Sequence, residues 1–286
     1  MTDLRDYIRE EIEEESRLGY LSEAEGERRK GLLDGTVTAS SGGGSAEAAD
    51  DSVGDGTVVA AWTEIEGANG PLSVYLARPA ARESAPGVIV IHENKGLVPY
   101  VRDVARRFAA AGFVALAPDL LSSAGGTRSF ADPAEATAAI GKIAPEDHVA
   151  ELKAAVTHLA NDAGVTEASV GVVGFCFGGG LAWRLITQDQ RLRAAVPFYG
   201  PNPPLADVAN IDTPVFAIYG ELDARITGGL PDIEAAMNAA GKPFDHIVLA
   251  GAQHAFHNDT NPERYNAEAA GVAWAAALEH LSKWLG

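Results

Sequence analysis

The chain has 286 residues, is 47% hydrophobic and carries a formal net charge of −18 at pH 7. Its length and apolar content suffice for one sizeable core. The acidity argues against binding to nucleic acid or to anionic membranes, because both need clustered Lys and Arg. The sequence has no apolar run long enough for a transmembrane helix, no secretory signal pattern and a single cysteine, so we expect a cytoplasmic protein.

Residues 1–52 form an acidic N-terminal arm, with 14 Asp or Glu and 6 Lys or Arg. Leu4, Ile8 and Ile12 recur at every fourth position and predict a helix with a narrow apolar stripe. The polar composition favours a solvated, partly ordered appendage. A role in oligomer contact, for example in a homo-oligomer, or in partner docking is the alternative.

The second half of this arm contains a helix signal followed by a linker signal. A capping-box pattern begins at Ser22 and predicts a short helix that ends near Gly35. The Ser- and Gly-rich stretch 40–45, followed by acidic residues at 50–51, predicts a flexible linker.

Residues 53–286 show alternating strand and helix patterns. Segments 57–65 and 72–77 predict an antiparallel pair of strands, and the apolar run 87–91 is typical of a parallel strand buried on both faces. Further strands are predicted at 113–117, 169–173, 194–198, 214–219 and 245–249, and helices at 98–111, 146–162, 178–187, 230–240 and 265–284. This alternation predicts an α/β fold with a mostly parallel sheet and helices on both faces.

The strongest local signal is the sequence Gly174-Phe175-Cys176-Phe177-Gly178, between a predicted strand and a predicted helix. This is the spacing of a nucleophile elbow, with Cys where most such enzymes have Ser. Glycine at both flanking positions avoids collisions in the sharp turn, and the start of the helix favours a thiolate. A small buried structural cysteine is the alternative, but it would not need this glycine frame.

An acid and a histidine follow the cysteine in the order that such a fold requires. Asp223 comes after the strand at 214–219, and His254 comes after the strand at 245–249. His254 would take the thiol proton, and Asp223 would orient the imidazole ring. Glu221 is the rival acid. All these residues follow strand ends, and open α/β sheets place their sites at that edge.

The loop after the first buried strand contains Glu93 and Asn94. Such a loop supplies one oxyanion-hole amide, so the backbone N–H groups of Asn94 and Phe177 are expected to bind the developing oxyanion. Glu93 is either a surface charge or a group that holds the Cys176 thiol or competes for its proton. The histidines lack metal-ligand spacing, and we expect neither a metal nor a cofactor.

The chain resembles the dienelactone hydrolase family (carboxymethylenebutenolidases) of the α/β-hydrolase superfamily. The resemblance rests on segments 87–96, 112–120, 170–180, 198–200, 218–223 and 254–256. It implies triad roles for Cys176, Asp223 and His254, and a Glu93 carboxylate that interacts with the cysteine until substrate displaces it. The implied reaction opens an unsaturated lactone through a thioester acyl-enzyme, without a cofactor.

One family feature is missing from the sequence. Members that act on the carboxylated lactone bind its carboxylate with arginines, one of them just after the His-x-Phe motif, where this chain has residues 257–259, His-Asn-Asp. The resemblance therefore implies the mechanism more strongly than the substrate. A general carboxylesterase or thioesterase with the same triad, and a catalytically silent binding module, are the alternatives. A redox sensor would need a resolving cysteine, which the chain lacks.

Overall fold

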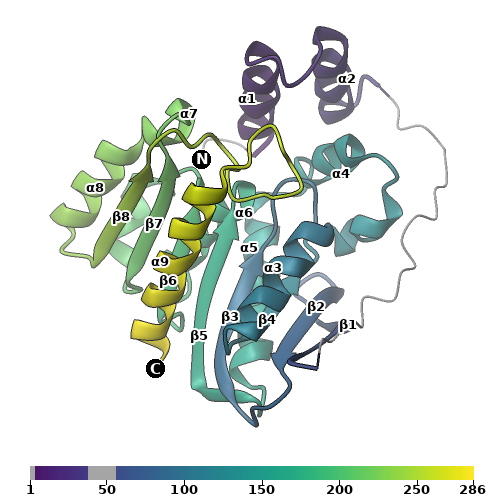
Figure 1. Ribbon diagram of the computed structural model, residues 1–286. Coiled ribbons are helices and arrows are strands. Elements are labelled where there is room, and N and C mark those ends of the chain that lie inside the picture. The colour runs from purple at the N-terminus through teal and green to yellow at the C-terminus, as the bar shows by residue number, and fades with distance from the viewer. Residues whose placement is uncertain (1–3, 38–55) are drawn as a thin grey trace.

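The computed structural model describes residues 4–37 and 56–286, and its strands form one eight-stranded sheet (Figure 1). The strands are β1 (Val58–Glu66), β2 (Pro71–Pro79), β3 (Ala85–Ile91), β4 (Val114–Pro118), β5 (Val165–Phe175), β6 (Ala194–Phe198), β7 (Val215–Gly220) and β8 (Phe244–Leu249). Their order in the sheet is β1-β2-β4-β3-β5-β6-β7-β8. The β1–β2 and β2–β4 pairs are antiparallel and the others are parallel, which confirms the predicted fold class.

Helices cover both faces of the sheet. On one face lie α3 (Pro99–Ala110) and α9 (Ala267–Leu285) (Figure 1). These two helices are in contact, since the ring centroids of Phe108 in α3 and Trp274 in α9 are 4.5 Å apart. On the other face α5 (Pro145–Ala160) packs against α6 (Phe177–Ile186), and α8 (Leu230–Ala239) packs against β8. The remaining helices after residue 56 are α4 (Pro133–Ile140), α7 (Ala224–Thr227), and the short 3₁₀ turns η1 (Ser122–Ala124), η2 (Thr127–Ser129) and η3 (Leu205–Asn210).

Each strand and helix predicted after residue 56 is present, with ends shifted by a few residues. Helix α4 was not predicted, although its start carries recognisable signals. The side chain of Asp132 accepts a hydrogen bond from the Ala134 N–H, and Pro133 occupies the first helical position. Both features are typical of a helix N-terminus, so α4 could have been found from the sequence.

The two helices predicted in the arm are also present, as α1 (Leu4–Arg17) and α2 (Glu23–Asp34). The Ser22 side chain caps α2 by accepting from the Glu25 N–H, and Gly35 ends the helix in the left-handed region. The predicted linker at 40–51 lies outside the described residues.

The expectation of a solvated arm is wrong for residues 4–37. Leu4, Ile8 and Ile12 are buried and belong to the main hydrophobic core. A Cβ atom added to Gly141, at the end of α4, would lie 2.5 Å from a Leu33 methyl group and 3.0 Å from an Ile8 methyl group. The arm helices therefore pack closely on the rest of the chain, which covers the apolar stripe of α1.

Within residues 4–37 and 56–286, no helix is both long enough and apolar enough to cross a bilayer.

Candidate active site

The turn between β5 and α6 holds Cys176 in a strained conformation, with φ 56° and ψ −118°. A Cβ atom on Gly174 would lie 2.0 Å from the carbonyl oxygen of Gly178. A Cβ atom on Gly178 would lie 2.5 Å from the carbonyl oxygens of His92 and Ile91. The predicted glycine frame is therefore needed because the turn closes on its own backbone and on the end of β3.

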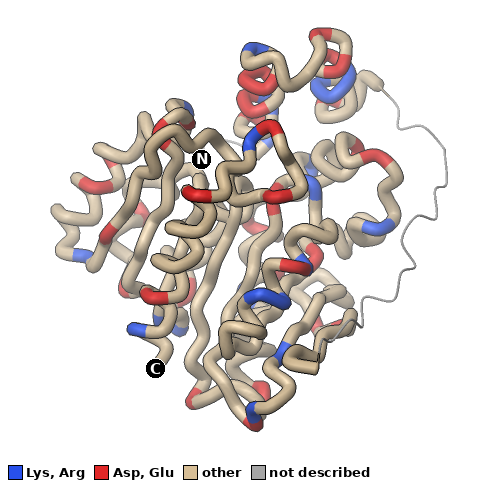
Figure 2. Tube along the Cα trace, viewed as in Figure 1, with Lys and Arg blue, Asp and Glu red and all other residues tan. Residues whose placement is uncertain are grey.

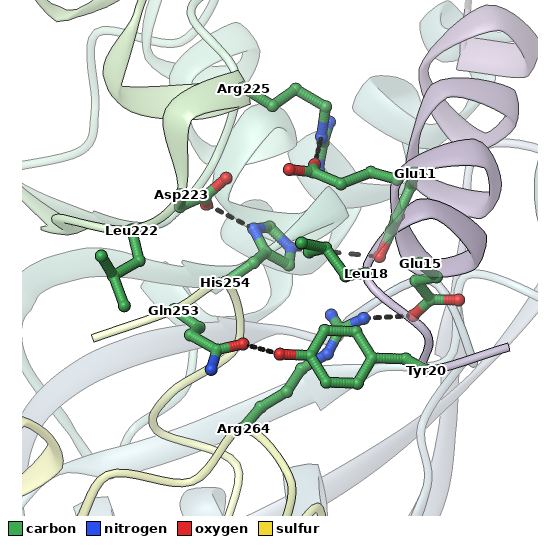
Figure 3. Close-up of a pocket in the computed structure, with 11 residues that line it drawn as sticks. Glu11, Glu15, Leu18, Tyr20, Leu222, Asp223, Arg225, Gln253, His254 and Arg264 are labelled. Atoms are coloured by element: carbon green, nitrogen blue, oxygen red, sulfur yellow. Dashed lines mark hydrogen bonds and ion pairs between the residues drawn. The ribbon is translucent and has the colours of Figure 1, made fainter. Parts of the chain in front are cut away.

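His254 lies beside Asp223, as the sequence predicted (Figure 3). The His254 Nδ1 atom is 2.6 Å from Asp223 Oδ2, and both residues are buried. The rival acid, Glu221, is exposed and accepts a hydrogen bond from the Gly251 N–H at 2.8 Å. Of the two acids weighed, Asp223 is thus the one in contact with the imidazole.

The other imidazole nitrogen of His254 faces the thiol. Cys176 Sγ, His254 Nε2 and a carboxylate oxygen of Glu11 all lie within 4.8 Å of one another. Nε2 is buried and has no hydrogen-bond partner among the described residues. The structure therefore brings together the three residues that the sequence selected, and adds a fourth, Glu11, from the arm.

Helix α1 supplies direct contacts to the thiol that the sequence analysis did not foresee. Cys176 Sγ donates to Glu11 Oε1 at 3.6 Å, and the Tyr7 hydroxyl lies 3.6 Å from Sγ. The other Glu11 oxygen accepts from the side-chain amide of Asn94 at 2.8 Å. The sequence does carry a signal that Glu11 is buried, since Tyr7 and Glu11 are spaced to share the helix face of the apolar residues Ile8 and Leu4, but it does not identify the partner. A carboxylate on an otherwise apolar face indicates a polar partner beneath it.

Glu93 is buried, so its interpretation as a surface charge is wrong. Its Oε2 atom accepts from the Asn258 side chain at 2.8 Å, and its Oε1 atom has no partner within the described part of the chain. Burial raises the pKa of this carboxyl above its ordinary value. The carboxylate that accepts from the thiol in this structure is Glu11, whereas the resemblance had pointed to Glu93.

Asn94 lies three residues beyond the end of β3, and Phe177 is the first residue of α6, two residues beyond the end of the neighbouring strand β5. The loop that carries Asn94 is held by His92, which is fully buried. His92 Nε2 accepts from the Leu120 N–H at 3.1 Å, so the proton is on Nδ1, which donates to the Glu93 carbonyl at 2.6 Å.

The electrostatics of the site favour a protonated thiol. Burial raises the pKa of Cys176, and the Glu11 carboxylate raises it further, whereas the His254 imidazole lowers it by less. Burial disfavours the charged form of His254, but the Asp223 carboxylate and the Cys176 sulfur raise the pKa of the imidazole well above its usual range. The sulfur has this effect only as a thiolate, so the imidazolium is favoured once the thiol has lost its proton. The raised pKa of Cys176 fits a resting thiol that donates to Glu11.

Replacing Glu11 with glutamine should lower the pKa of Cys176, because the neutral amide no longer disfavours the thiolate. The thiolate fraction at neutral pH should rise several-fold. The chain has a single cysteine, so the pH dependence of the rate at which iodoacetamide alkylates the protein reports the thiolate of Cys176. Glu13→Gln, at an exposed position of the same helix, is the control and should leave the titration unchanged. An unchanged or raised thiol pKa in Glu11→Gln would contradict this account.

Comparison with known proteins agrees with this geometry. Residues 72–285 match the model of the dienelactone hydrolase family. A Methylorubrum extorquens protein named "putative carboxymethylenebutenolidase" is 31% identical over 239 residues, which cover 79% of this chain and 80% of that protein. A Bradyrhizobium protein named "probable 2-oxo-3-(5-oxofuran-2-ylidene)propanoate lactonase" is 31% identical over 241 residues, which cover 80% of this chain and 95% of that protein.

A solved structure shows the same likeness. The crystal structure titled as a putative dienelactone hydrolase from Klebsiella pneumoniae superposes with a TM-score of 0.73 at 28% sequence identity, covering 79% of this chain and 99% of that chain. The family match begins at residue 72, so α1 and α2 lie outside it. The chain belongs to the dienelactone hydrolase family and is a hydrolase of carboxylic esters or lactones.

Proposed function

We propose that the chain opens a lactone or cleaves a small ester through a thioester formed on Cys176. The observation that carries this proposal is that the His254 imidazole lies between Asp223 and Cys176. Its Nδ1 atom is 2.6 Å from Asp223 Oδ2, and the sulfur lies on a turn that needs glycine at both flanking positions. Residues 53–286 would form the catalytic domain, and the substrate would be a small molecule.

In the first half of the reaction, His254 Nε2 removes the thiol proton and Sγ attacks the substrate carbonyl carbon. The backbone N–H groups of Asn94 and Phe177 bind the oxyanion, at about 3 kcal/mol per donor. Collapse of the tetrahedral intermediate breaks the C–O bond, and the imidazolium returns the proton to the alkoxide. In a lactone that alkoxide stays attached to the acyl group.

In the second half, His254 removes a proton from water, and the resulting hydroxide attacks the thioester carbon. The C–S bond breaks, the acid leaves, and the sulfur regains a proton. Asp223 stabilises the imidazolium in both halves. Glu93 lines the same small space as Cys176. We propose that its carboxylate accepts a hydrogen bond from the thiol whenever Glu11 does not contact the sulfur.

A general carboxylesterase or thioesterase is the second candidate. The observation that favours it is Asn258, which stands in the segment after the His-x-Phe motif and donates to Glu93. An amide at that place offers no positive charge to a substrate carboxylate.

The proposal is tested by trapping the acyl-enzyme. A chromogenic short-chain ester is mixed with the protein, the reaction is quenched in acid, and the intact mass is measured. We expect an added acyl group on Cys176 that hydroxylamine removes, and neither adduct nor turnover in Cys176→Ala. Turnover that survives in Cys176→Ala would refute thiol chemistry. A spectroscopic assay with a dienelactone then separates the lactonase from the general esterase.

A further inference from the structure

The sulfur has almost no free space beside it in this structure. The space lined by Cys176, Glu11 and Asn94 has a volume of about 20 Å³, whereas small-molecule sites usually measure about 300–1,000 Å³. A larger cavity of about 180 Å³ is lined by His254 and by α1, but not by the sulfur. An ester carbonyl therefore has no room to reach Sγ while α1 lies in this position.

Helix α1 supplies part of the lining of this space and contacts the sulfur directly. Glu11 and Tyr7 are the two side chains that contact Sγ from the arm, each at 3.6 Å. Asn94 donates to Glu11 at 2.8 Å, so a residue of the expected oxyanion loop is engaged by the helix. A carboxylate is a poor target for a thiol because it is negatively charged and has no good leaving group. Glu11 thus lies next to Sγ, where a substrate carbonyl would have to lie, but the thiol does not react with it.

Two ion pairs hold α1 against the rim of the site (Figure 3). Arg225, in α7, donates to Glu14 at 3.1 Å, and Arg264, in the loop before α9, donates to Glu15 at 2.8 Å. Just after α1, the Tyr20 hydroxyl donates to the Gln253 side chain. The helix is thus held by loops that follow both β7 and β8.

This attachment is suited to reversible release. The ion pairs of Glu14 and Glu15 are largely buried, since none of the four side chains is more than 18% exposed. A buried ion pair contributes little net stability, because the cost of removing both charges from water offsets their attraction, and water hydrates the charges again once they separate. The apolar stripe of α1 opposes release, since Leu4, Ile8 and Ile12 are buried. Release of α1 would also remove the Glu11 carboxylate, which is one of the groups that keep the thiol protonated.

We propose that α1 is an autoinhibitory cover, whose Glu11 and Tyr7 occupy the place of the scissile group, and that turnover requires α1 to leave the rim of the site. The proposal rests on the proposed function only in taking Cys176 as the nucleophile. The opposite role is a lid that stays closed during catalysis and lends Tyr7 to the substrate. The experiment below distinguishes the two.

The test compares two full-length double variants with the same change of charge. Glu14→Ala with Glu15→Ala removes both ion pairs to the rim. Glu10→Ala with Glu13→Ala removes two exposed charges of the same helix and is the control; Figure 2 shows the acidic residues along α1. Neither double variant alters the apolar stripe, and urea unfolding verifies that both proteins are folded.

The first readout is the rate at which iodoacetamide alkylates Cys176, the single cysteine of the chain. We expect a roughly tenfold faster rate in the Glu14/Glu15 variant, because Arg225 and Arg264 lose these partners on α1, and a rate close to wild type in the control. The second readout is kcat/KM for a chromogenic ester, which should rise in parallel. Hydrogen exchange of the α1 amides should accelerate in the Glu14/Glu15 variant alone.

An alkylation rate in the Glu14/Glu15 variant that equals the rate of wild type or of the control overturns the proposal. Faster alkylation combined with lower kcat/KM also overturns it, because α1 would then be a catalytic lid. Alkylation does not depend on ester chemistry. If wild type and variant both lack esterase activity while the variant alkylates faster, the proposed function fails and the cover stands.

Discussion

Asp223→Asn is expected to lower kcat by roughly 10³–10⁴-fold while leaving the fold intact. Asp223 Oδ2 lies 2.6 Å from His254 Nδ1, so the native imidazole carries its proton on Nδ1 and leaves Nε2 free to accept the thiol proton. An asparagine amide can instead donate to Nδ1. The ring then carries its proton on Nε2, where it faces the sulfur and cannot act as a base.

The matched control is Glu221→Gln, two residues upstream. The Glu221 side chain is exposed and accepts a hydrogen bond from the Gly251 backbone, so this change should leave kcat within about a factor of two of wild type. Steady-state kinetics with a chromogenic ester measure both variants, and circular dichroism verifies that they fold. A large loss in Glu221→Gln with a small loss in Asp223→Asn would reverse the assignment of the acid.

The sequence predicted the placement of Cys176, Asp223 and His254 because each prediction depended on local pattern and chain order. Gly174 and Gly178 identified the turn, and the two later residues each followed a predicted strand. Strands of a parallel sheet bring their carboxyl ends to one edge, so residues distant in the chain meet there without any further information. The choice between Asp223 and Glu221 was open in the sequence and needed the side-chain geometry.

The arm was misjudged for a physical reason. Average polarity over residues 1–52 suggested a solvated segment, but a helix needs only one apolar face to pack. Four of the five buried residues in α1 are apolar or aromatic, and the fifth is Glu11. No periodicity in the arm could indicate that Glu11 would meet Cys176, since that contact joins residues 165 positions apart. The resemblance could not supply it either, because the family match begins at residue 72.

Gly178→Ala is expected to destabilise the fold by about 3 kcal/mol or more. The added Cβ atom would lie 2.5 Å from the carbonyl oxygens of Ile91 and His92, and backbone atoms at the end of a central strand cannot move aside as a flexible side chain can. Either α6 shifts away from β3, which misplaces Cys176, or the strand bends. Both outcomes should lower the urea midpoint, and both should lower ester turnover.

Gly271→Ala provides the matched control for this change. Gly271 lies in α9 on an exposed face, and a Cβ atom added there would meet nothing within 4 Å. Alanine is the better helix former, so this variant should be more stable than wild type by up to about 1 kcal/mol. Opposite shifts of the two urea midpoints are therefore expected from the same chemical substitution. A Gly178→Ala protein as stable and as active as wild type would mean that α6 does not pack against β3 as closely as the nucleophile elbow requires.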